Sequence, residues 1–246
     1  MDLISVIIPY FKKKKFIEEA VNSILNQSYT NIEILIIYDD KDVDDLNYLN
    51  EIFNLNKKIR IIVNEKNIGA GLSRNKGIYL ANGKYIGFLD ADDYWHQEKV
   101  FKQIQFMKEN NFKASHTSYQ IIDEKKNILD VRRARGFNSY KDIIKSCDIG
   151  LSTVIIEKSI IKDDIQFVEL KTKEDFVLWL KILYSGIAIG ALDENLTFWR
   201  KLENSLSSSF FQKMVDGYRV YRKYMKFNSL LSLYLLLCLS INFLRK

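Results

Sequence analysis

The sequence predicts an α/β fold with a mostly parallel central sheet. Short apolar runs alternate with helical patterns through residues 3–89. The chain has 246 residues, of which 47% are hydrophobic and 28% are charged, as expected for one large packed domain. A single proline and ten glycines exclude a disordered or collagen-like chain. Strands that alternate with helices imply parallel pairing, right-handed crossovers and helices on both faces of the sheet.

The first half of the chain predicts four strands joined by three helices. The strands are apolar runs at residues 3–9, 32–38, 59–63 and 85–89. The helices have apolar residues at helical spacing and cover residues 16–26, 42–54 and 72–81. In such sheets ligands bind beyond the carboxyl ends of the strands, so the residues that follow each strand are candidate site residues.

The second half of the chain is less regular. Strands are predicted at residues 113–122, 128–133 and 152–156, and helices at residues 140–147 and 174–184. We expect one domain over residues 1–210, followed by a helical, partly apolar extension over residues 211–246.

Charge and cysteine content set further limits. The formal net charge of +6 suits nucleic acid, an anionic membrane or a phosphorylated substrate and does not choose among them. Cys147 and Cys238 have no metal-ligand neighbours at zinc spacing, so we expect no zinc site and a reduced, intracellular protein. No signal-peptide pattern precedes the first strand, which predicts a cytoplasmic chain.

Three aspartates follow the fourth predicted strand, at positions Asp90, Asp92 and Asp93. Carboxylates crowded at one strand end repel one another unless a cation joins them. Their hard oxygens suit Mn²⁺ or Mg²⁺, and such an ion bridging a diphosphate stabilises the leaving group. The alternative is a loop whose aspartates cap a helix that begins near His96.

A glycine-containing loop precedes the third predicted helix. Gly69 and Gly71 would let the backbone approach an anionic ligand, which a helix N-terminus favours. Arg74 adds a forked donor for phosphate. The alternative is a loop with a solvated arginine.

Several spaced motifs follow one another along the chain. They are Val6-Ile7-Ile8-Pro9, Ser23-Ile24-Leu25-Asn26-Gln27-Ser28-Tyr29, Glu33-Ile34-Leu35-Ile36-Ile37, Ser73-Arg74-Asn75-Lys76-Gly77 and Gly87-Phe88-Leu89-Asp90-Ala91-Asp92-Asp93. This series resembles the family 2 glycosyltransferases of the GT-A fold, a Rossmann-like nucleotide-sugar-binding fold. Glu174-Asp175-Phe176-Val177-Leu178-Trp179-Leu180 is similar to the family motif that carries the catalytic base. Trp199-Arg200 through Asn204-Ser205-Leu206-Ser207 resembles a third, weaker stretch.

The resemblance implies an inverting transfer of a sugar from a nucleoside diphosphate donor, with UDP expected, to an acceptor hydroxyl. The enzyme would be a metal-dependent hexosyl- or N-acetylhexosaminyl-transferase of bacterial surface polysaccharide or lipooligosaccharide synthesis. Its acceptor would be a saccharide or a lipid-linked saccharide. Residues 1–100 would form the nucleotide-binding half, and residues 101–210 the acceptor-binding half.

The resemblance also implies a base pocket. Pro9 and Phe11, or Tyr10 in its place, would line the pocket, and Asp39 would accept a base N–H. The family usually has two adjacent acids followed by Gly-Ser after the second strand. Here Tyr38 takes the first position and Asp40 follows Asp39, so the choice between Asp39 and Asp40 stays open.

The remaining implied roles concern the diphosphate, the metal and the base. Arg74 would lie near the nucleotide, Asp90 would contact the ribose side, and Asp92 would coordinate the metal together with Asp90. Asp175 would deprotonate the acceptor hydroxyl, with Glu174 as its neighbour. From the residues alone, Asp175 begins an amphipathic helix, where burial against Phe176 and Trp179 would raise its pKa toward that of a useful base. The alternative is an acid that the helix dipole favours.

A competing class is a non-catalytic nucleotide- or nucleic-acid-binding α/β module, suggested by the basic charge. Three aspartates at the expected ligand edge would repel phosphate without a metal, so we expect no nucleic acid partner.

The C-terminal extension has a different composition. Residues 230–244 are almost wholly apolar, Arg222, Lys223 and Lys226 precede them, and Arg245-Lys246 follows. This run is too short to span a bilayer, and its basic flanks favour peripheral contact with the cytoplasmic membrane face. The alternatives are a helix packed on the catalytic domain and an oligomer contact.

Overall fold

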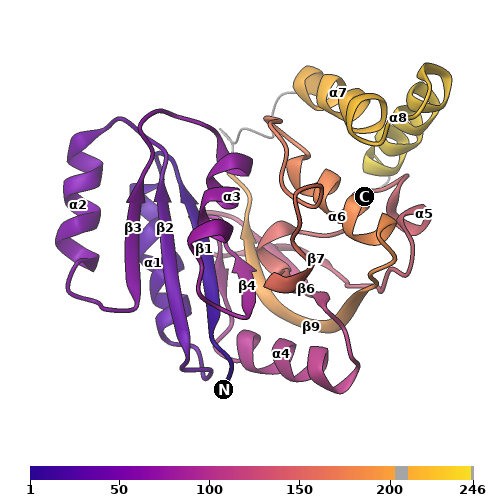
Figure 1. Cartoon of the computed structure of the whole chain (residues 1–246). Helices are drawn as coiled ribbons and strands as arrows, with labels where there is room; N and C mark the ends of the chain where they lie inside the picture. The colour runs from indigo at the N-terminus through magenta and orange to yellow at the C-terminus, as the bar shows by residue number, and fades with distance from the viewer. Residues whose placement is uncertain (203–209, 245–246) are drawn as a thin grey trace.

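The computed structural model describes residues 1–202 and 210–244, which form one nine-stranded sheet with helices on both faces (Figure 1). The strand order is β3 (Ile59–Val63), β2 (Ile32–Tyr38), β1 (Ile4–Tyr10), β4 (Tyr85–Phe88), β8 (Ile155–Glu157), β6 (Ala114–Ile122), β9 (Ile189–Arg200) and β5 (Tyr94–Trp95), with β7 (Ile128–Arg132) paired to β6. The predicted α/β fold is confirmed. The parallel pairs are β1 with β2, β1 with β4, β2 with β3, and β6 with β9. The other pairs, which all involve strands of the second half, are antiparallel.

The first half of the chain follows the predicted pattern. Its parallel strands are β1 (Ile4–Tyr10), β2 (Ile32–Tyr38), β3 (Ile59–Val63) and β4 (Tyr85–Phe88). The connections hold α1 (Lys14–Leu25), α2 (Val43–Phe53) and α3 (Ala70–Leu80). β1, β2 and β4 are mostly apolar because helices cover both sides of the sheet, whereas the edge strand β3 has two exposed side chains, Arg60 and Val63.

Two hydrophobic cores lie on opposite faces of this sheet, because successive side chains of a strand point to opposite sides. Val6 and Ile8 of β1 face a core shared with α1, α2 and α4 (Lys99–Glu109). Ile7 faces a second core shared with α3 and α6 (Glu174–Tyr184). With both faces covered, the accessible edge is the one where the parallel strands end.

The second half departs from the predictions in three places. Its strands are β5 (Tyr94–Trp95), β6 (Ala114–Ile122), β7 (Ile128–Arg132), β8 (Ile155–Glu157) and β9 (Ile189–Arg200). The strand expected at residues 152–156 is a 3₁₀ turn, Leu151–Thr153, followed by β8. The helix expected at residues 140–147 is the shorter α5 (Tyr140–Ile143). β5 and β9 were not predicted.

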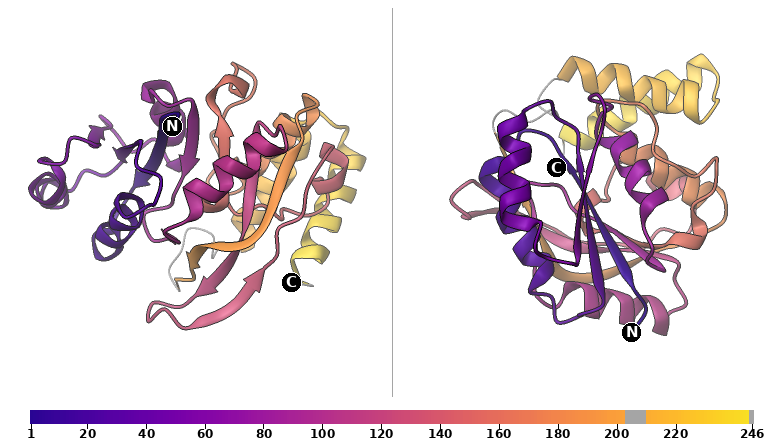
Figure 2. Two further views of the ribbon diagram at one scale, coloured as in Figure 1. Left: turned by 90° about the horizontal axis from the view of Figure 1, so that it is seen from below. Right: turned by 60° about the vertical axis from the view of Figure 1, so that its left-hand side comes forward.

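Two helices close the described chain and lie at one edge of the molecule (Figure 2). They are α7 (Phe210–Arg219) and α8 (Ser229–Leu244), joined through a π-helix, Val220–Tyr224. Leu235, Leu236 and Leu239 of α8 belong to the same core as α6. Within residues 1–202 and 210–244, no helix is both long and apolar enough to cross a membrane.

Candidate active site

The candidate site residues gather at the carboxyl ends of β1, β2 and β4. Asp39 directly follows β2 and is 3% exposed. Its Oδ1 accepts the Ile68 backbone N–H at 2.9 Å and the Asn64 amide at 2.8 Å, and its Oδ2 accepts the Gly69 N–H at 2.8 Å. The Asp39 carboxylate therefore fixes the loop that leads into α3. Asp40 contrasts with it, because its buried Oδ2 has no hydrogen-bond partner among the residues that the structure describes.

The two aromatic rings after β1 have different surroundings. Tyr10 is fully buried, stacks on Tyr38 with ring centroids 5.3 Å apart, and donates its hydroxyl to Asp45 at 2.6 Å. Burial, with the neighbouring Asp45 carboxylate, raises the pKa of Tyr10. Phe11 is 37% exposed, and Pro9 is half-buried. Of the two rings, only that of Phe11 is open to a ligand.

The two glycines before Arg74 have different structural roles. Gly69 has a φ of +84°, a conformation that disfavours side chains. A Cβ at Gly71 would meet the Val168 carbonyl oxygen at 2.9 Å and Glu174 Cγ at 3.1 Å. The close approach at Gly71 therefore brings α6 against the first turn of α3.

Arg74 is a buried bridge and not a solvated side chain, since 4% of the side chain is exposed. Its Nη2 donates to Asp90 at 2.6 Å and its Nη1 donates to Glu174 at 2.7 Å. The guanidinium also lies over the Phe167 ring at 5.4 Å. Burial lowers the pKa of Arg74, but the two carboxylates outweigh this effect and raise it. The arginine therefore stays charged and joins β4 to α6.

The three aspartates after β4 have three different environments. Asp90 pairs with Arg74, and Asp92 forms an ion pair with Lys13 at 2.7 Å. Asp93 is buried and accepts the Ser152 hydroxyl at 2.5 Å. Burial raises the pKa of Asp92 and raises that of Asp93 well above its usual range, and neighbouring aspartates add to both shifts. The aspartates do not cap the next helix, because α4 begins after Glu98.

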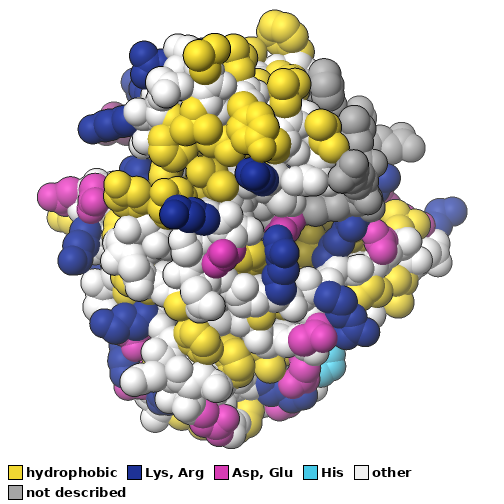
Figure 3. All heavy atoms as spheres, turned by 90° about the vertical axis from the view of Figure 1, so that its right-hand side faces the viewer, with side chains coloured by type: hydrophobic (Ala, Val, Ile, Leu, Met, Phe, Trp, Pro, Cys, Tyr) yellow, Lys and Arg dark blue, Asp and Glu magenta, His cyan; other side chains and the backbone are white. Residues whose placement is uncertain are grey.

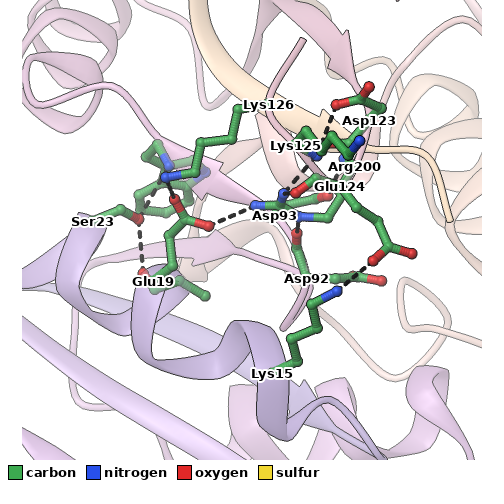
Figure 4. Close-up of polar contacts among 12 residues, drawn as sticks. Lys15, Glu19, Ser23, Asp92, Asp93, Asp123, Glu124, Lys125, Lys126 and Arg200 are labelled. Atoms are coloured by element: carbon green, nitrogen blue, oxygen red, sulfur yellow. Dashed lines mark hydrogen bonds and ion pairs between the residues drawn. The ribbon is translucent and has the colours of Figure 1, made fainter.

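Arg200, at the end of β9, holds the acidic loop in place (Figure 4). Its backbone N–H donates to Asp93 at 2.9 Å, and its Nε donates to the Asp92 carbonyl at 2.9 Å. Its Nη2 pairs with Glu19 of α1 at 2.6 Å, while the side chain is 2% exposed. The sequence indicated Arg200 only as part of a weak motif. Residues 204–207 of that motif lie outside the described residues.

A divalent cation fits this donor set with two carboxylates. Among the described residues no group of three or more His, Cys, Asp or Glu side chains is placed to hold a metal. Mg²⁺ and Mn²⁺ are commonly held by one or two carboxylates plus substrate phosphates, so Asp92 and Asp90 are sufficient. Asp92 and Asp90 each pair with one cationic side chain, Lys13 and Arg74 respectively, so a bound cation would share these carboxylates with them.

One pocket brings Asp90, which follows β4, together with Asp175 of α6. It encloses about 170 Å³ and is lined by Asp90 and Asp175. The other lining residues are Tyr119, Gly150, Leu151, Ser152, Thr153, Thr197 and Trp199.

Asp175 lies in the first turn of α6, beside Glu174. Its Oδ1 accepts its neighbour's backbone N–H, that of Phe176, at 2.7 Å. Burial raises the pKa of Asp175, although the Arg74 charge opposes the shift. Burial likewise raises the pKa of Glu174 to about 7, against the opposing effect of Arg74. A carboxylate with a raised pKa, facing a pocket, can accept a proton from a bound hydroxyl.

An α/β sheet that brings strand-end acids and a helix-borne carboxylate to one pocket is the arrangement of glycosyltransferases with the GT-A fold. The chain belongs to glycosyl transferase family 2, whose sequence model matches residues 5–162. It is 38% identical over 219 residues to the Escherichia coli glucosyltransferase WfaP, covering 87% of this chain and 84% of WfaP. Family membership supports the enzyme and not the non-catalytic binding module.

Further relatives agree with this assignment. The Bacillus subtilis protein TuaG, a putative teichuronic acid biosynthesis glycosyltransferase, is 32% identical over 90% of this chain and 88% of its own. A glycosyltransferase of Rickettsia felis is 39% identical over 196 residues, but this match spans 32% of that protein's length. The fold is similar to residues 1–349 of S. aureus TarS in complex with UDP-GlcNAc. That likeness has a TM-score of 0.74 at 23% identity and covers 95% of this chain and 70% of the TarS chain.

Proposed function

We propose that the chain transfers a hexose or N-acetylhexosamine from a UDP-sugar to a hydroxyl of a lipid-linked saccharide. The observation that carries this proposal is the pocket that Asp90 and Asp175 line together. The similarity to WfaP supports the substrate class, since WfaP is a UDP-Glc:alpha-D-GlcNAc-diphosphoundecaprenol beta-1,3-glucosyltransferase. The setting would be bacterial surface polysaccharide or lipooligosaccharide synthesis.

The donor nucleotide would bind along the ends of β1 and β2. The exposed ring of Phe11 is the better candidate for stacking on uracil, because the Tyr10 ring is enclosed. Asp39 has one oxygen, Oδ2, that accepts a single hydrogen bond and retains a free lone pair for a base N–H. The unpartnered buried Oδ2 of Asp40 is the other candidate acceptor. Pro9 would line the same pocket.

The diphosphate would lie between the acidic loop and α3. Asp92 and Asp90 would hold a Mn²⁺ or Mg²⁺ ion, which neutralises charge on the departing diphosphate when it is bound. Asp90 would also contact the ribose side. Arg74 would keep Asp90 in place, since its ion pair at 2.6 Å fixes one carboxylate oxygen.

The chemical step would be a single displacement with inversion at the sugar's anomeric carbon. Asp175 would accept the proton of the acceptor hydroxyl as the new bond between the acceptor oxygen and that carbon forms. The bond from the same carbon to the donor phosphate oxygen breaks, and UDP leaves. Glu174, paired with Arg74 at 2.7 Å, would hold the first turn of α6 in position.

A lipid-linked acceptor lies in a membrane, so the proposal includes peripheral contact with the cytoplasmic membrane face.

The test is a donor screen. Purified protein would be incubated with several UDP-sugars and GDP-sugars, with Mn²⁺, with Mg²⁺ and with chelator, and released nucleotide would be measured. We expect metal-dependent release from at least one UDP-sugar. Release from GDP-sugars alone would refute the UDP assignment, and full activity in chelator would refute the metal.

A further inference from the structure

Helix α8 exposes a continuous row of apolar side chains. Its residues Leu230, Leu233, Tyr234, Leu237 and Ile241 are between 48% and 82% exposed. They recur at helical spacing and therefore share one face of the helix, which we call the α8 stripe. In Figure 3 hydrophobic side chains gather over the upper part of this side of the molecule, with lysine and arginine side chains among and below them.

The opposite face of α8 is fixed to the protein. Leu235, Leu236 and Leu239 are between 4% and 8% exposed and belong to the core. A Cβ at Gly217 of α7 would meet Leu236 Cδ1 at 2.8 Å, so the two helices pack closely there. Asn242 also donates its side-chain amide to the Lys145 carbonyl at 2.9 Å. These contacts fix α8 on the protein with the α8 stripe facing outward.

The surroundings of the α8 stripe are basic. Arg222, Lys223 and Lys226 precede the helix and are exposed. The exposed Lys145 lies beside the stripe, with its Nζ 5.5 Å from the Tyr234 ring centroid. The sequence from position 217 to the C-terminus contains no Asp or Glu. An apolar surface with basic groups around it complements a lipid bilayer that carries anionic headgroups.

We propose that the α8 stripe docks this enzyme on an anionic lipid surface, with the helix axis lying in the plane of the membrane. A helix of 16 residues is about 24 Å long, shorter than the hydrocarbon core of about 30 Å. Its packed face also prevents it from leaving the protein to cross the bilayer. Insertion of the stripe buries apolar side chains while the flanking cations remain among the headgroups.

A second copy of the chain fits this surface less well. In a twofold dimer the same patch meets itself, so the basic residues around one stripe would face those around the other. Like charges across such an interface are unfavourable, and the stripe offers no carboxylate to compensate them. The basic residues around the stripe therefore favour an anionic partner.

The first test is co-sedimentation of the full chain with vesicles of phosphatidylcholine that contain phosphatidylglycerol. We expect Leu237→Glu to lower vesicle partitioning by roughly tenfold or more, because it places a charge in the apolar contact. The matched control is Leu55→Glu, on the loop between α2 and β3, where the leucine is 91% exposed. This control should partition like the unchanged protein.

A second arm tests the charges. Replacement of Lys223 and Lys226 by Gln should weaken partitioning by about fivefold per lysine at low salt, since each basic residue near such a surface contributes about 1 kcal/mol. The difference should shrink as salt rises. Vesicles of phosphatidylcholine alone should not distinguish the double variant from the unchanged chain.

The docking proposal rests on the membrane contact that the proposed function includes, but sugar transfer itself is measured without lipid, so docking and transfer can fail separately. If the unchanged chain stays in the supernatant with anionic vesicles, or if Leu237→Glu partitions normally, the docking proposal is wrong. It is also wrong if the unchanged chain is a dimer that Leu237→Glu converts to a monomer without any vesicle binding. UDP-sugar turnover without lipid, measured on the same variants, reports on the proposed function alone.

Discussion

Arg74 on α3 and Glu174 on α6 form an ion pair at 2.7 Å although they stand 100 positions apart in the sequence. The Nη2 atom of the same guanidinium pairs with Asp90 at 2.6 Å. One buried cation therefore sets the distance between the strand-end acid and the helix that carries the proposed base, Asp175. The planar fork of an arginine can hold both carboxylates at once, which a lysine cannot.

Arg74→Lys tests this link. We expect sugar transfer to fall by about a hundredfold, because a displacement of roughly 1 Å at a reacting group has an effect of that size. The measurement is kcat and KM for the donor. Arg60→Lys is the control, since Arg60 is 44% exposed and its contact with Glu33 is long, at 3.8 Å. Equal kcat for the two variants would contradict the bridging role.

Asp175→Asn tests the base. We expect transfer to fall by roughly 10²–10⁴-fold while UDP binding stays nearly unchanged, because the amide cannot accept the acceptor's proton. Isothermal titration with UDP and a turnover assay measure the two quantities separately. Asp163→Asn, on an exposed loop, is the control. Lost UDP affinity with normal turnover would place Asp175 in the donor site instead.

The pH dependence of transfer tests the environment of the same pair. Burial raises the pKa values of both Glu174, to about 7, and Asp175. A carboxylate base works only when ionised, so kcat should fall as the pH drops through this raised range. In Glu174→Gln one of two adjacent negative charges is removed, so the acid limb should move to lower pH. A limb that stays in place or moves upward would show that the two carboxylates are not coupled.

The first half of the fold could be predicted closely because β1, β2 and β4 are largely buried and form short apolar runs. The edge strand β3 is more exposed, but its apolar residues still predict it, and residues 32–38 and 59–63 match β2 and β3 at both ends. β9 lacks this signal, since Asp193, Glu194 and Asn195 interrupt it where its pairing with β6 is irregular. β5, with two residues, is too short for any periodicity.

The site could be predicted only in part, because some of its contacts join residues that are far apart in the sequence. Acids at strand ends are visible in the sequence because they follow an apolar run. Whether Tyr10 or Phe11 faces a ligand is not visible, since the outcome depends on Asp45 and Tyr38, which enclose Tyr10. Arg200 reaches the Asp92 carbonyl across 108 positions, so no local pattern indicates its role.

Arg200→Lys tests the support of the acidic loop. A lysine has no Nε–H in the arginine geometry, so the bond to the Asp92 carbonyl is lost and buried polar groups remain unpaired. We expect the free energy of unfolding to fall by about 2–4 kcal/mol, measured by urea denaturation. Lys126→Gln is the control, because Lys126 also pairs with Glu19 but is 57% exposed. It should lower the free energy by less than about 1 kcal/mol. Equal losses in both variants would contradict the supporting role.

The last prediction concerns the ion pair between Lys13 and Asp92, at 2.7 Å. The ammonium group occupies a carboxylate oxygen that a divalent cation would use, so the cation must displace Lys13 before it binds. Lys13→Met removes this competitor and should tighten Mn²⁺ binding to the protein without donor. Asp92→Asn removes the ligand itself and should weaken the same binding to below detection.

Mn²⁺ affinity, measured by titration calorimetry without donor, separates these outcomes from any effect on turnover. Lys14→Met is the control, since Lys14 pairs with Asp45 at 3.3 Å and does not contact the acidic loop. In the presence of a UDP-sugar we expect Lys13→Met to weaken donor binding, although it strengthens metal binding. A lysine released from Asp92 lies beside the proposed diphosphate and would stabilise it, so its loss should raise the donor KM while the metal affinity improves. Unchanged Mn²⁺ affinity in Lys13→Met would mean that Asp92 does not hold the cation, whatever happens to turnover.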